Sequence, residues 1–576
     1  MLIIANGRAQ APVVIPAGAS ETNRFAAEEL IKYLKKMSGV ELTLYEDSYP
    51  LESAPERFEI CVGPVDRAGR PGMDGLKNDG YRLTLAGNGF FIQGENDRGI
   101  LYGVYGLLER VLGCRFFAQG VEKIPARREI DLPAMDRQII PPFEYRETSW
   151  NCYFDPDIAY KRGLNGHRHG IDPKRGGCIS YYGFVHTFAR NYISPEEYFD
   201  EHPEYFSMVD GKRLRDRSQL CLTNPEVFAI VRDKLRRNIE AHPEATIFSI
   251  SQNDWYNPCQ CPECARIDEE EGSHAGTLIR FVNALARDIA GDYPHVIIDT
   301  LAYQYTRQAP KITKPEPNVA VRVCSIECCF THPLAECDVM PEYFKKDTPE
   351  GASLQKDMAD WAKICNRIHV WDYTTQFRHY LNPMPNFYVL QPNIQFFIQN
   401  GVTGLFEQGN RESVSGECGE LRAYLISRLM WEPDMNVSQA MNEFLTGYYG
   451  QAGAPIREYL DRIARHVQDH HIHMGIFDNP THGHITDEML NEADRLWDEA
   501  EALADDEDVL YRVQCSRMQV RYCRINRMAK DDPERAEVVE HFIRDLHRFG
   551  FTRTREARPL EKSIEQIRAG ETNDVW

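Results

Sequence analysis

The chain has 576 residues, of which 42% are hydrophobic and 27% charged, as is usual for a globular protein of several domains. Its 66 basic and 87 acidic residues give a formal net charge of −21, which disfavours nucleic acid as a partner. No apolar run approaches the roughly 20 residues that span a bilayer, so we expect no membrane association. The first residues lack the basic and apolar segments of a signal peptide, which predicts a cytoplasmic protein, or a secreted one if an export signal preceded this chain.

Residues 1–138 alternate strand and helix signals and predict an α/β accessory domain. The clearest helix runs from Glu21 to Met37, with apolar residues on one face and a stop at Gly39. A proline-rich link at 139–142 closes this domain.

Eight apolar runs of strand type follow in residues 143–431, and amphipathic helical patterns separate most of them. They are Phe143–Ser149, Cys178–Val185, Ser218–Leu222, Thr246–Ser251, His295–Ala302, Val319–Ile326, Ile368–Tyr373 and Val402–Phe406. Eight strands alternating with helices over this length predict a (β/α)8 TIM barrel.

Strand signals stop at about residue 436, and residues 436–576 read as an all-α C-terminal domain rich in charged residues. This region holds a histidine cluster at 470–473, followed by His482 and His484, without ligand spacing on one helix face. We expect a surface loop there. The sequence leaves the formation of homo-oligomers open.

Several motifs of the predicted barrel resemble a large bacterial group defined by a domain of unknown function, to which glycoside hydrolase family 163 belongs. The motifs are Phe184 to Phe188, His202 to Lys212, Gln219 to Pro225, Asn253-Asp254 with the following cysteines, Trp371 to Tyr373 and Gly401 to Gln408. Known members of family 163 are endo-β-N-acetylglucosaminidases, so the resemblance implies a hydrolase of β-linked N-acetylhexosaminides. The first domain is similar to the one that precedes the barrel in α-glucuronidases and β-hexosaminidases.

Four carboxylates fall at predicted strand ends, where barrel enzymes carry their catalytic groups: Asp254, Glu327, Asp372 and Glu407. Glycoside hydrolysis needs a proton donor and a group that stabilises the positive sugar carbon. Asp254 precedes Trp255 and Tyr256, which predicts drier surroundings and the role of general acid. Glu407 is then the ionised partner, facing Asp254 across one pocket, with Glu327 in reserve for either role.

Three of these carboxylates also have a structural interpretation, whereas a carboxylate at the position of Glu407 has little structural purpose. Asp254 fits a turn cap, Glu327 fits an ion pair with Arg322 or another base, and Asp372 fits a loop held through backbone amides.

Aromatic and polar residues near the same strand ends suit the flat faces and hydroxyls of a sugar. The candidate substrate-binding residues are Trp150, His186, Asn253, Trp255, Tyr303, Trp371 and Tyr373. Asn253 and Asp254 superficially match the adjacent polar pair of hydrolases that use the substrate's own acetamido group. Catalysis of this kind needs no cofactor, and the expected partner is a carbohydrate.

Two other functions stay open. The first is an α-glucuronidase-like hydrolysis of acidic sugars, with Arg146, Arg162 and Arg168 near the rim to bind a carboxylate. The second is a barrel that binds a sugar without cleaving it.

Cys259, Cys261 and Cys264 lie within six residues, close enough to ligate one structural zinc ion. Free thiols in a tight loop are the alternative. The candidates for a fourth ligand are Cys221, Cys328, Cys329 and Cys418.

Overall fold

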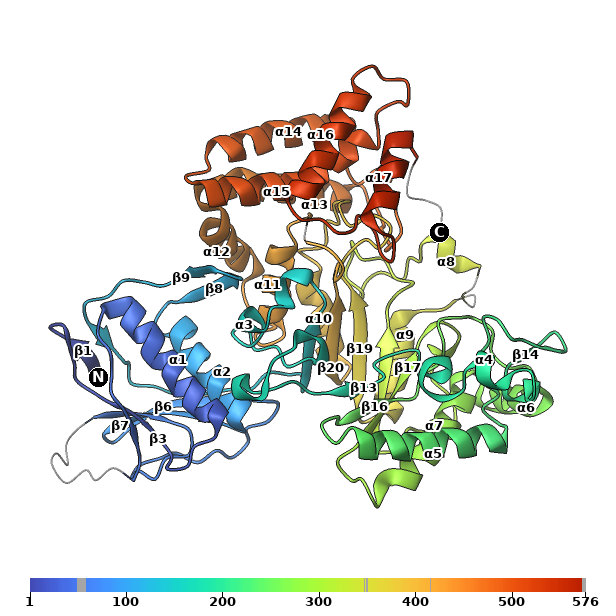
Figure 1. Ribbon diagram of the computed structural model, residues 1–576, viewed down its shortest axis with the longest axis horizontal. Coiled ribbons are helices and arrows are strands. Elements are labelled where there is room, and N and C mark those ends of the chain that lie inside the picture. Colours follow the sequence, from blue (N-terminus) through green and yellow to red (C-terminus); the bar gives the residue numbers. More distant parts are fainter. Residues whose placement is uncertain (49–57, 347, 349–350, 415, 572–576) are drawn as a thin grey trace.

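The structure is a computed structural model that describes residues 1–48, 58–346, 348, 351–414 and 416–571. Figure 1 shows three regions: an N-terminal α/β part in blue, a central sheet with its helices in green to orange, and a group of C-terminal helices in orange to red.

The N-terminal part is built on a six-stranded mixed sheet with the order β11-β6-β7-β5-β3-β4. Its strands are β3 (Val13–Ile15), β4 (Leu44–Glu46), β5 (Glu59–Val62), β6 (Tyr81–Ala86), β7 (Gly89–Gly94) and β11 (Asp136–Ile139). Helices α1 (Glu21–Ser38) and α2 (Asp97–Arg110) pack against each other beside it. Two smaller sheets join β1 (Leu2–Ala5), β2 (Arg8–Ala9) and β10 (Ile130–Asp131), and β8 (Arg115–Ala118) with β9 (Val121–Lys123).

Helix α1 begins and ends where its sequence indicates. Ser20 caps the first turn by accepting a hydrogen bond from the amide of Asn23. Gly39 takes a left-handed conformation with φ of 77°, which glycine adopts without steric cost, so the predicted helix end is confirmed.

The central sheet is parallel and has seven strands in the order β12-β20-β19-β18-β17-β16-β13. They are β12 (Tyr145–Thr148), β13 (Tyr181–Tyr182), β16 (Ile247–Ser249), β17 (Ile297–Ala302), β18 (Val319–Cys324), β19 (Ile368–Tyr373) and β20 (Val402–Gln408). The longer helices between them are α5 (Pro225–Ala241), α6 (Pro262–Glu271), α7 (Ala275–Ala290), α9 (Leu354–Ile364), α10 (Leu390–Gln399) and α11 (Gly419–Leu429).

The prediction of eight strands is wrong by one. The segment Ser218–Leu222 does not join the sheet: only Leu220 forms an isolated bridge, with Phe206. Gln219 instead donates from its side chain to the backbone oxygens of Asn253 and Trp255, which ties this segment to the loop after β16. Strand β13 therefore pairs directly with β16.

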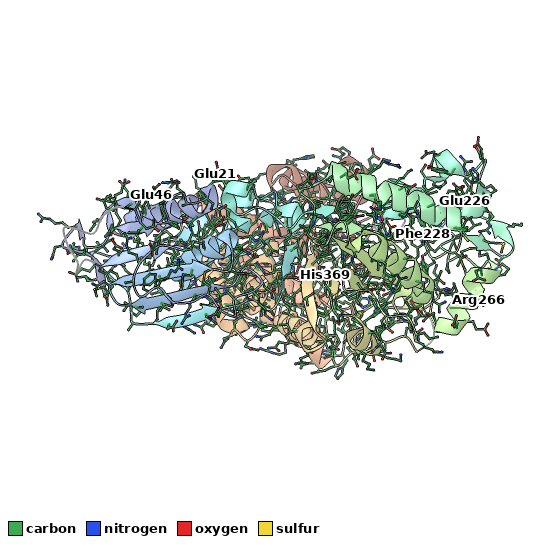
Figure 2. The ribbon with its side chains drawn as sticks, turned by 90° about the horizontal axis from the view of Figure 1, so that it is seen from below. Glu21, Glu46, Glu226, Phe228, Arg266 and His369 are labelled. Carbon is green, nitrogen blue, oxygen red and sulfur yellow. The ribbon has the colours of Figure 1, made fainter. Side chains whose placement is uncertain are left out.

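The sheet curls until its two edge strands approach each other. Tyr145 on β12 and Tyr181 on β13 have ring centroids 5.4 Å apart. Phe184, just after β13, packs against Trp371 on β19 and Phe406 on β20, with centroids 5.6 and 5.5 Å away. Contacts between strands that are far apart in the sheet order require a curled sheet with a filled interior, so the central region is of the TIM-barrel type. Figure 2 shows His369 of β19 near the centre of the molecule, whereas Glu226 and Arg266 of the flanking helices lie toward one end.

Ion pairs of two buried arginines help to fasten the N-terminal part to the central region. Arg146 on β12 is fully buried and binds Asp79 at 2.7 Å, and Arg162 binds Glu109 of α2 at 2.5 Å. The burial of Arg146 is tolerable because its remaining N–H groups donate to backbone oxygens, among them that of Phe143.

The helices of the C-terminal region are α12 (Val437–Tyr449), α13 (Gly453–Asp469), α14 (Asp487–Ala502), α15 (Glu507–Ile525), α16 (Arg535–Arg548) and α17 (Leu560–Ala569).

Candidate functional site

The carboxyl ends of the parallel strands surround one opening of the curled sheet, which we call the mouth. The alternation of side chains along each strand decides which residues face this opening. Trp371 and Phe406 point into the interior, since both contact Phe184. Residues one position further along a strand point to the opposite face. Asp372 and Glu407 therefore face outward, toward the surrounding helices.

Asp372 and Glu407 lie directly opposite each other in the register of β19 and β20, and both are at most 2% exposed. Burial raises the pKa of Asp372 to about 6. Burial and the neighbouring Asp372 charge raise the pKa of Glu407 well above its usual value. The pair consequently retains a proton to higher pH than ordinary carboxylates do.

Asp254 lies in the loop directly after β16, and its side chain is exposed. Its Oδ1 accepts a hydrogen bond of 2.9 Å from the hydroxyl of Tyr303, which follows β17. The dry surroundings expected for Asp254 belong instead to Glu407, because the latter lies between the sheet and its helices. The structure does not bring these two carboxylates into one pocket: they lie on opposite faces of the sheet.

Glu327 lies in the loop after β18 and is buried. It binds Arg307 at 2.8 Å, and Arg307 also binds Asp357 of α9 at 2.8 Å. The ion-pair interpretation of Glu327 thus holds with a base other than Arg322, which binds Asp299 inside the sheet. Burial raises the pKa of Glu327 despite the nearby guanidinium.

The charges of Asp254 and Glu327 nevertheless affect the pKa values of the same two tyrosines. Burial, followed by the charge of Asp254 and with a further contribution from Glu327, raises the pKa of Tyr303 well above its usual value. Burial also raises the pKa of Tyr373, and the charges of both carboxylates add to this effect. Both charges thus lie near the aromatic groups at the carboxyl ends of β17 and β19.

The predicted substrate-binding residues divide between the mouth and the core. Trp371 is partly exposed, donates to Gln408 at 2.6 Å and stacks on Tyr373 with centroids 6.3 Å apart. His186 is partly exposed, has φ of 54°, and its ring lies 5.9 Å from that of Tyr303.

Three other predicted residues are placed differently. Trp150 is 1% exposed and donates to Thr374, so it belongs to the packing outside the sheet. Trp255 is 42% exposed. Asn253 uses both ends of its amide in the loop, accepting from the amide of Ala189 and donating to Ser218.

The sequence did not single out three charged residues near the mouth. It grouped Arg168 with two other arginines, and it did not identify Arg411 or Glu556. Arg168 lies 4.1 Å from the ring centroid of Phe184, and its closest carboxylate is the buried Glu147 at 3.8 Å. Burial lowers the pKa of Arg168, and the positive charge of Arg411, an exposed residue after β20, adds to this effect. Arg146 and Arg162, which the sequence grouped with Arg168, belong to the domain contact.

Glu556, in the C-terminal region, lies close enough to Asp254 for their charges to interact. Its amide donates to the oxygen of Phe377 at 2.8 Å. Burial raises its pKa, and the charges of Glu412 and Asp254 add to this effect, while Arg411 opposes it. No local sequence signal identifies Glu556, because it lies about 150 residues beyond the last strand and in a different structural region.

The three predicted metal-ligating cysteines gather with a fourth. The Sγ atoms of Cys221, Cys259, Cys261 and Cys264 lie within 4.8 Å of one another, and all four residues are buried. The amide of Met208 donates to the Sγ of Cys259 at 3.4 Å.

A family model described as a domain of unknown function, DUF4838, matches residues 116–461. The chain belongs to the DUF4838 family. This confirms the expected resemblance to a domain-of-unknown-function group. A model of the N-terminus of glycosyl hydrolase family 67 matches residues 5–107.

This DUF4838 member is also similar to characterised proteins. Alpha-glucuronidase A of Emericella nidulans is 33% identical over 106 residues, which are 17% of this chain and 12% of that protein. The chain thus spans only a small part of this curated relative. A family 115 4-O-methyl-α-glucuronidase with specificity for decorated arabinogalactans shares the fold, with a TM-score of 0.57, 11% identity and coverage of 100% of this chain and 78% of that one. A β-hexosaminidase of Streptomyces plicatus has a TM-score of 0.42 at 10% identity, over 79% of this chain and 92% of that one.

No helix in the described ranges combines the length and apolar character needed to cross a membrane.

The shared proton of Asp372 and Glu407 gives a testable pH dependence. A carboxyl group whose pKa is raised on folding contributes stability below its unfolded pKa of about 4, and this is lost as pH rises through the folded pKa. Glu407→Gln removes one of the two titrating carboxyl groups, and with it the charge repulsion between Glu407 and Asp372. We therefore expect its urea-unfolding midpoint to fall less between about pH 4 and pH 8 than that of the parent protein.

Glu336→Gln is the matched control, because Glu336 is exposed. Its pH profile should follow that of the parent. Parallel profiles for the parent and Glu407→Gln would show that the pair does not share a proton.

Proposed function

We propose that this DUF4838 protein is a glycoside hydrolase in which Asp254 faces the sugar. The observation that carries this proposal is the exposed Asp254 carboxylate, which is hydrogen-bonded by Tyr303. Tyr303 belongs to a cluster of buried side chains against which the partly exposed ring of Trp371 packs. Aromatic faces bind the apolar faces of pyranose rings, and a carboxylate next to them can stabilise a positive sugar carbon.

The second carboxylate of the proposed mechanism is Glu556. A general acid must be protonated near neutral pH and must reach the leaving oxygen. Glu556 is the candidate for this role because burial raises its pKa, it is partly exposed, and its charge interacts with that of Asp254. Asp254 then acts as the ionised group, which reverses the role expected for it from the sequence. Asp372 and Glu407 face away from the mouth and make no contact with the sugar in this mechanism.

The proposed substrate carries an acidic sugar, such as a glycosidically linked uronic acid. The side chain of Arg168 is only 18% exposed, and among the described residues no carboxylate lies closer to it than that of Glu147 at 3.8 Å, so its guanidinium is available for a further anion. Arg411 adds a second positive charge nearby. Guanidinium groups bind carboxylates through paired, charge-assisted hydrogen bonds.

The comparisons support this substrate class indirectly. The curated relative is named an α-glucuronidase, the family 67 model matches the N-terminal part, and the structure with the highest TM-score quoted above is named a 4-O-methyl-α-glucuronidase. The family 67 match ends before the central sheet begins, and the match to the curated relative covers only 17% of this chain, so the substrate proposal depends on Arg168.

The second candidate is hydrolysis of a β-linked N-acetylhexosaminide, the activity implied by the resemblance to glycoside hydrolase family 163. It is favoured by the adjacent hydroxyl of Tyr303 and carboxylate of Asp254, which together can hold an acetamido group. It is weakened because Asn253 is engaged in its loop. A barrel that binds sugar without cleaving it is the remaining alternative.

Leaving-group dependence tests the two catalytic roles. Glu556→Gln should slow hydrolysis of unactivated glycosides by about 10²-fold to 10⁴-fold while sparing activated aryl glycosides, which need little protonation. Asp254→Asn should slow both classes, because it removes stabilisation of the sugar carbon itself. Steady-state kinetics on a panel of aryl α-glucuronides, aryl N-acetyl-β-glucosaminides and their unactivated counterparts measures both effects.

Glu327→Gln is the matched control for the acid, since it makes the same carboxylate-to-amide change in a residue paired with Arg307. It should lower stability without changing the ratio of rates for activated and unactivated substrates. If Glu327→Gln alone produces the leaving-group dependence, Glu327 is the acid. Inactivity of the parent on every glycoside, with measurable sugar binding, would favour the non-catalytic alternative.

Substrate charge tests the role of Arg168. Arg168→Ala should lower kcat/KM for an acidic glycoside by about 10-fold to 150-fold, the value of a charged hydrogen bond, and leave a neutral glycoside of the same linkage nearly unchanged. Equal losses on both substrates would indicate a structural role. Arg162→Ala removes a guanidinium from the domain contact instead, and it should not discriminate between the two substrates.

We also propose that Cys221, Cys259, Cys261 and Cys264 hold a structural zinc ion. Four thiolates complete a closed tetrahedral site with no open position, and the 3.6 Å between the Sγ atoms of Cys221 and Cys261 is close to the edge of a zinc–sulfur tetrahedron, about 3.8 Å.

Cys259→Ser should lose one zinc ion per chain, measured by elemental analysis of protein purified without chelator. Cys178→Ser changes a cysteine outside this set and should keep the parent zinc content. Unchanged zinc content in Cys259→Ser would exclude the four-cysteine site.

A further inference from the structure

The loop after β18 is joined to a segment of the C-terminal region that lies between α13 and α14. The amide of Phe330 donates to the oxygen of Met474 at 2.8 Å. The hydroxyl of Thr331 donates to the oxygen of Ile472 at 2.8 Å, and the amide of Met474 donates back to that hydroxyl at 3.2 Å. Two segments about 140 residues apart in sequence are therefore held in fixed register.

Four side chains with metal-ligating atoms converge at this junction. Cys329, His332 and Cys337 come from the loop after β18, and His473 comes from the other segment. One ligand atom from each lies within 4.8 Å of all the others. The rings of His332 and His473 have centroids only 4.4 Å apart.

The distances within this set fit the edges of a metal-centred tetrahedron. The Sγ of Cys329 is 3.4 Å from Nδ1 of His332, and the Sγ of Cys337 is 3.5 Å from Nδ1 of His473. Bond lengths of about 2.3 Å for zinc–sulfur and 2.0–2.1 Å for zinc–nitrogen predict a sulfur–nitrogen edge of about 3.5 Å.

We propose that Cys329, His332, Cys337 and His473 form a second structural zinc site, which fastens the loop after β18 to the C-terminal helices. Two thiolates and two imidazoles suit zinc, and four protein ligands leave no open position for catalysis. Separate thiol–imidazole hydrogen bonds account for two pairs of atoms at these distances, but not for the convergence of both pairs on one point. The histidine cluster expected to be a surface loop thus supplies one ligand, which its local spacing conceals because the other three ligands lie more than 130 residues earlier.

The site also bears on the mouth of the sheet. Glu327 lies two residues before Cys329, in the same loop. On the other segment, Ile476 accepts a hydrogen bond from the amide of Phe377 at 2.8 Å, and Phe377 accepts one from the amide of Glu556 at 2.8 Å. The proposed zinc therefore fixes the elements that position both residues, a consequence that depends on the proposed function, whereas the existence of the site does not.

The zinc stoichiometry of the 576-residue chain tests the site. Together with the four-cysteine site, the parent protein should hold two zinc ions per chain, and Cys337→Ser and Cys259→Ser should each hold one. One zinc ion that is lost in Cys259→Ser but kept in Cys337→Ser overturns the second site. One zinc ion lost only in Cys337→Ser supports it and rejects the four-cysteine site instead.

Alkylation of the unaltered protein gives a test that needs no variant. Cys337 is partly exposed, so iodoacetamide should modify it only after a chelator has removed the metal, as read by peptide mass spectrometry. Cys178, equally partly exposed and outside both sets, should react at the same rate with and without chelator. Equal rates for Cys337 under both conditions would overturn the proposal, whatever the enzymatic activity of the protein.

Discussion

The buried guanidinium of Arg322 holds the curled sheet together from inside. It binds Asp299 on the adjacent strand at 2.9 Å, and it lies 4.9 Å from the ring centroid of Tyr181 and 4.3 Å from that of Phe184. A charge taken out of water is costly unless it is paired and hydrogen-bonded, so this arrangement constrains where β13 can lie relative to β17 and β18. The rings of Phe184 and Trp371, which lie inside the curled sheet, both pack against this guanidinium.

The mouth is assembled from more than the central sheet. The loop after β16 supplies Asp254, the segment between β12 and β13 supplies Arg168, and the C-terminal region supplies Glu556 through the backbone of Phe377. The N-terminal part contributes through the ion pair of Asp79 with Arg146, which fixes the strand that precedes Arg168. The three regions therefore depend on each other for the geometry of one site.

The pleat of the sheet explains why some predicted site residues reach the mouth and others do not. Trp371 and Tyr373 are two residues apart and share the inner face, whereas Asp372 between them faces the helices. The same alternation places Glu407 outside and the neighbouring Phe406 inside. This distinction was available in principle from the strand pattern, since a single inward residue fixes the direction of all others on its strand. It was hidden in practice because parallel strands covered on both faces show no alternation of apolar and polar residues.

Local signals in the sequence determined the helices with clear caps, such as α1, the seven strands of the central sheet and the cysteine spacing at 259–264, because short-range periodicity and turn chemistry encode them. The outcome at Ser218–Leu222 was not local: its strand-like composition yields to side-chain hydrogen bonds from Gln219 to a distant loop. Tertiary structure alone brought Cys221 to the other three cysteines, His473 to Cys329 and Glu556 to Asp254. Such groupings depend on how the chain closes over tens to hundreds of residues, and no pattern within one segment records them.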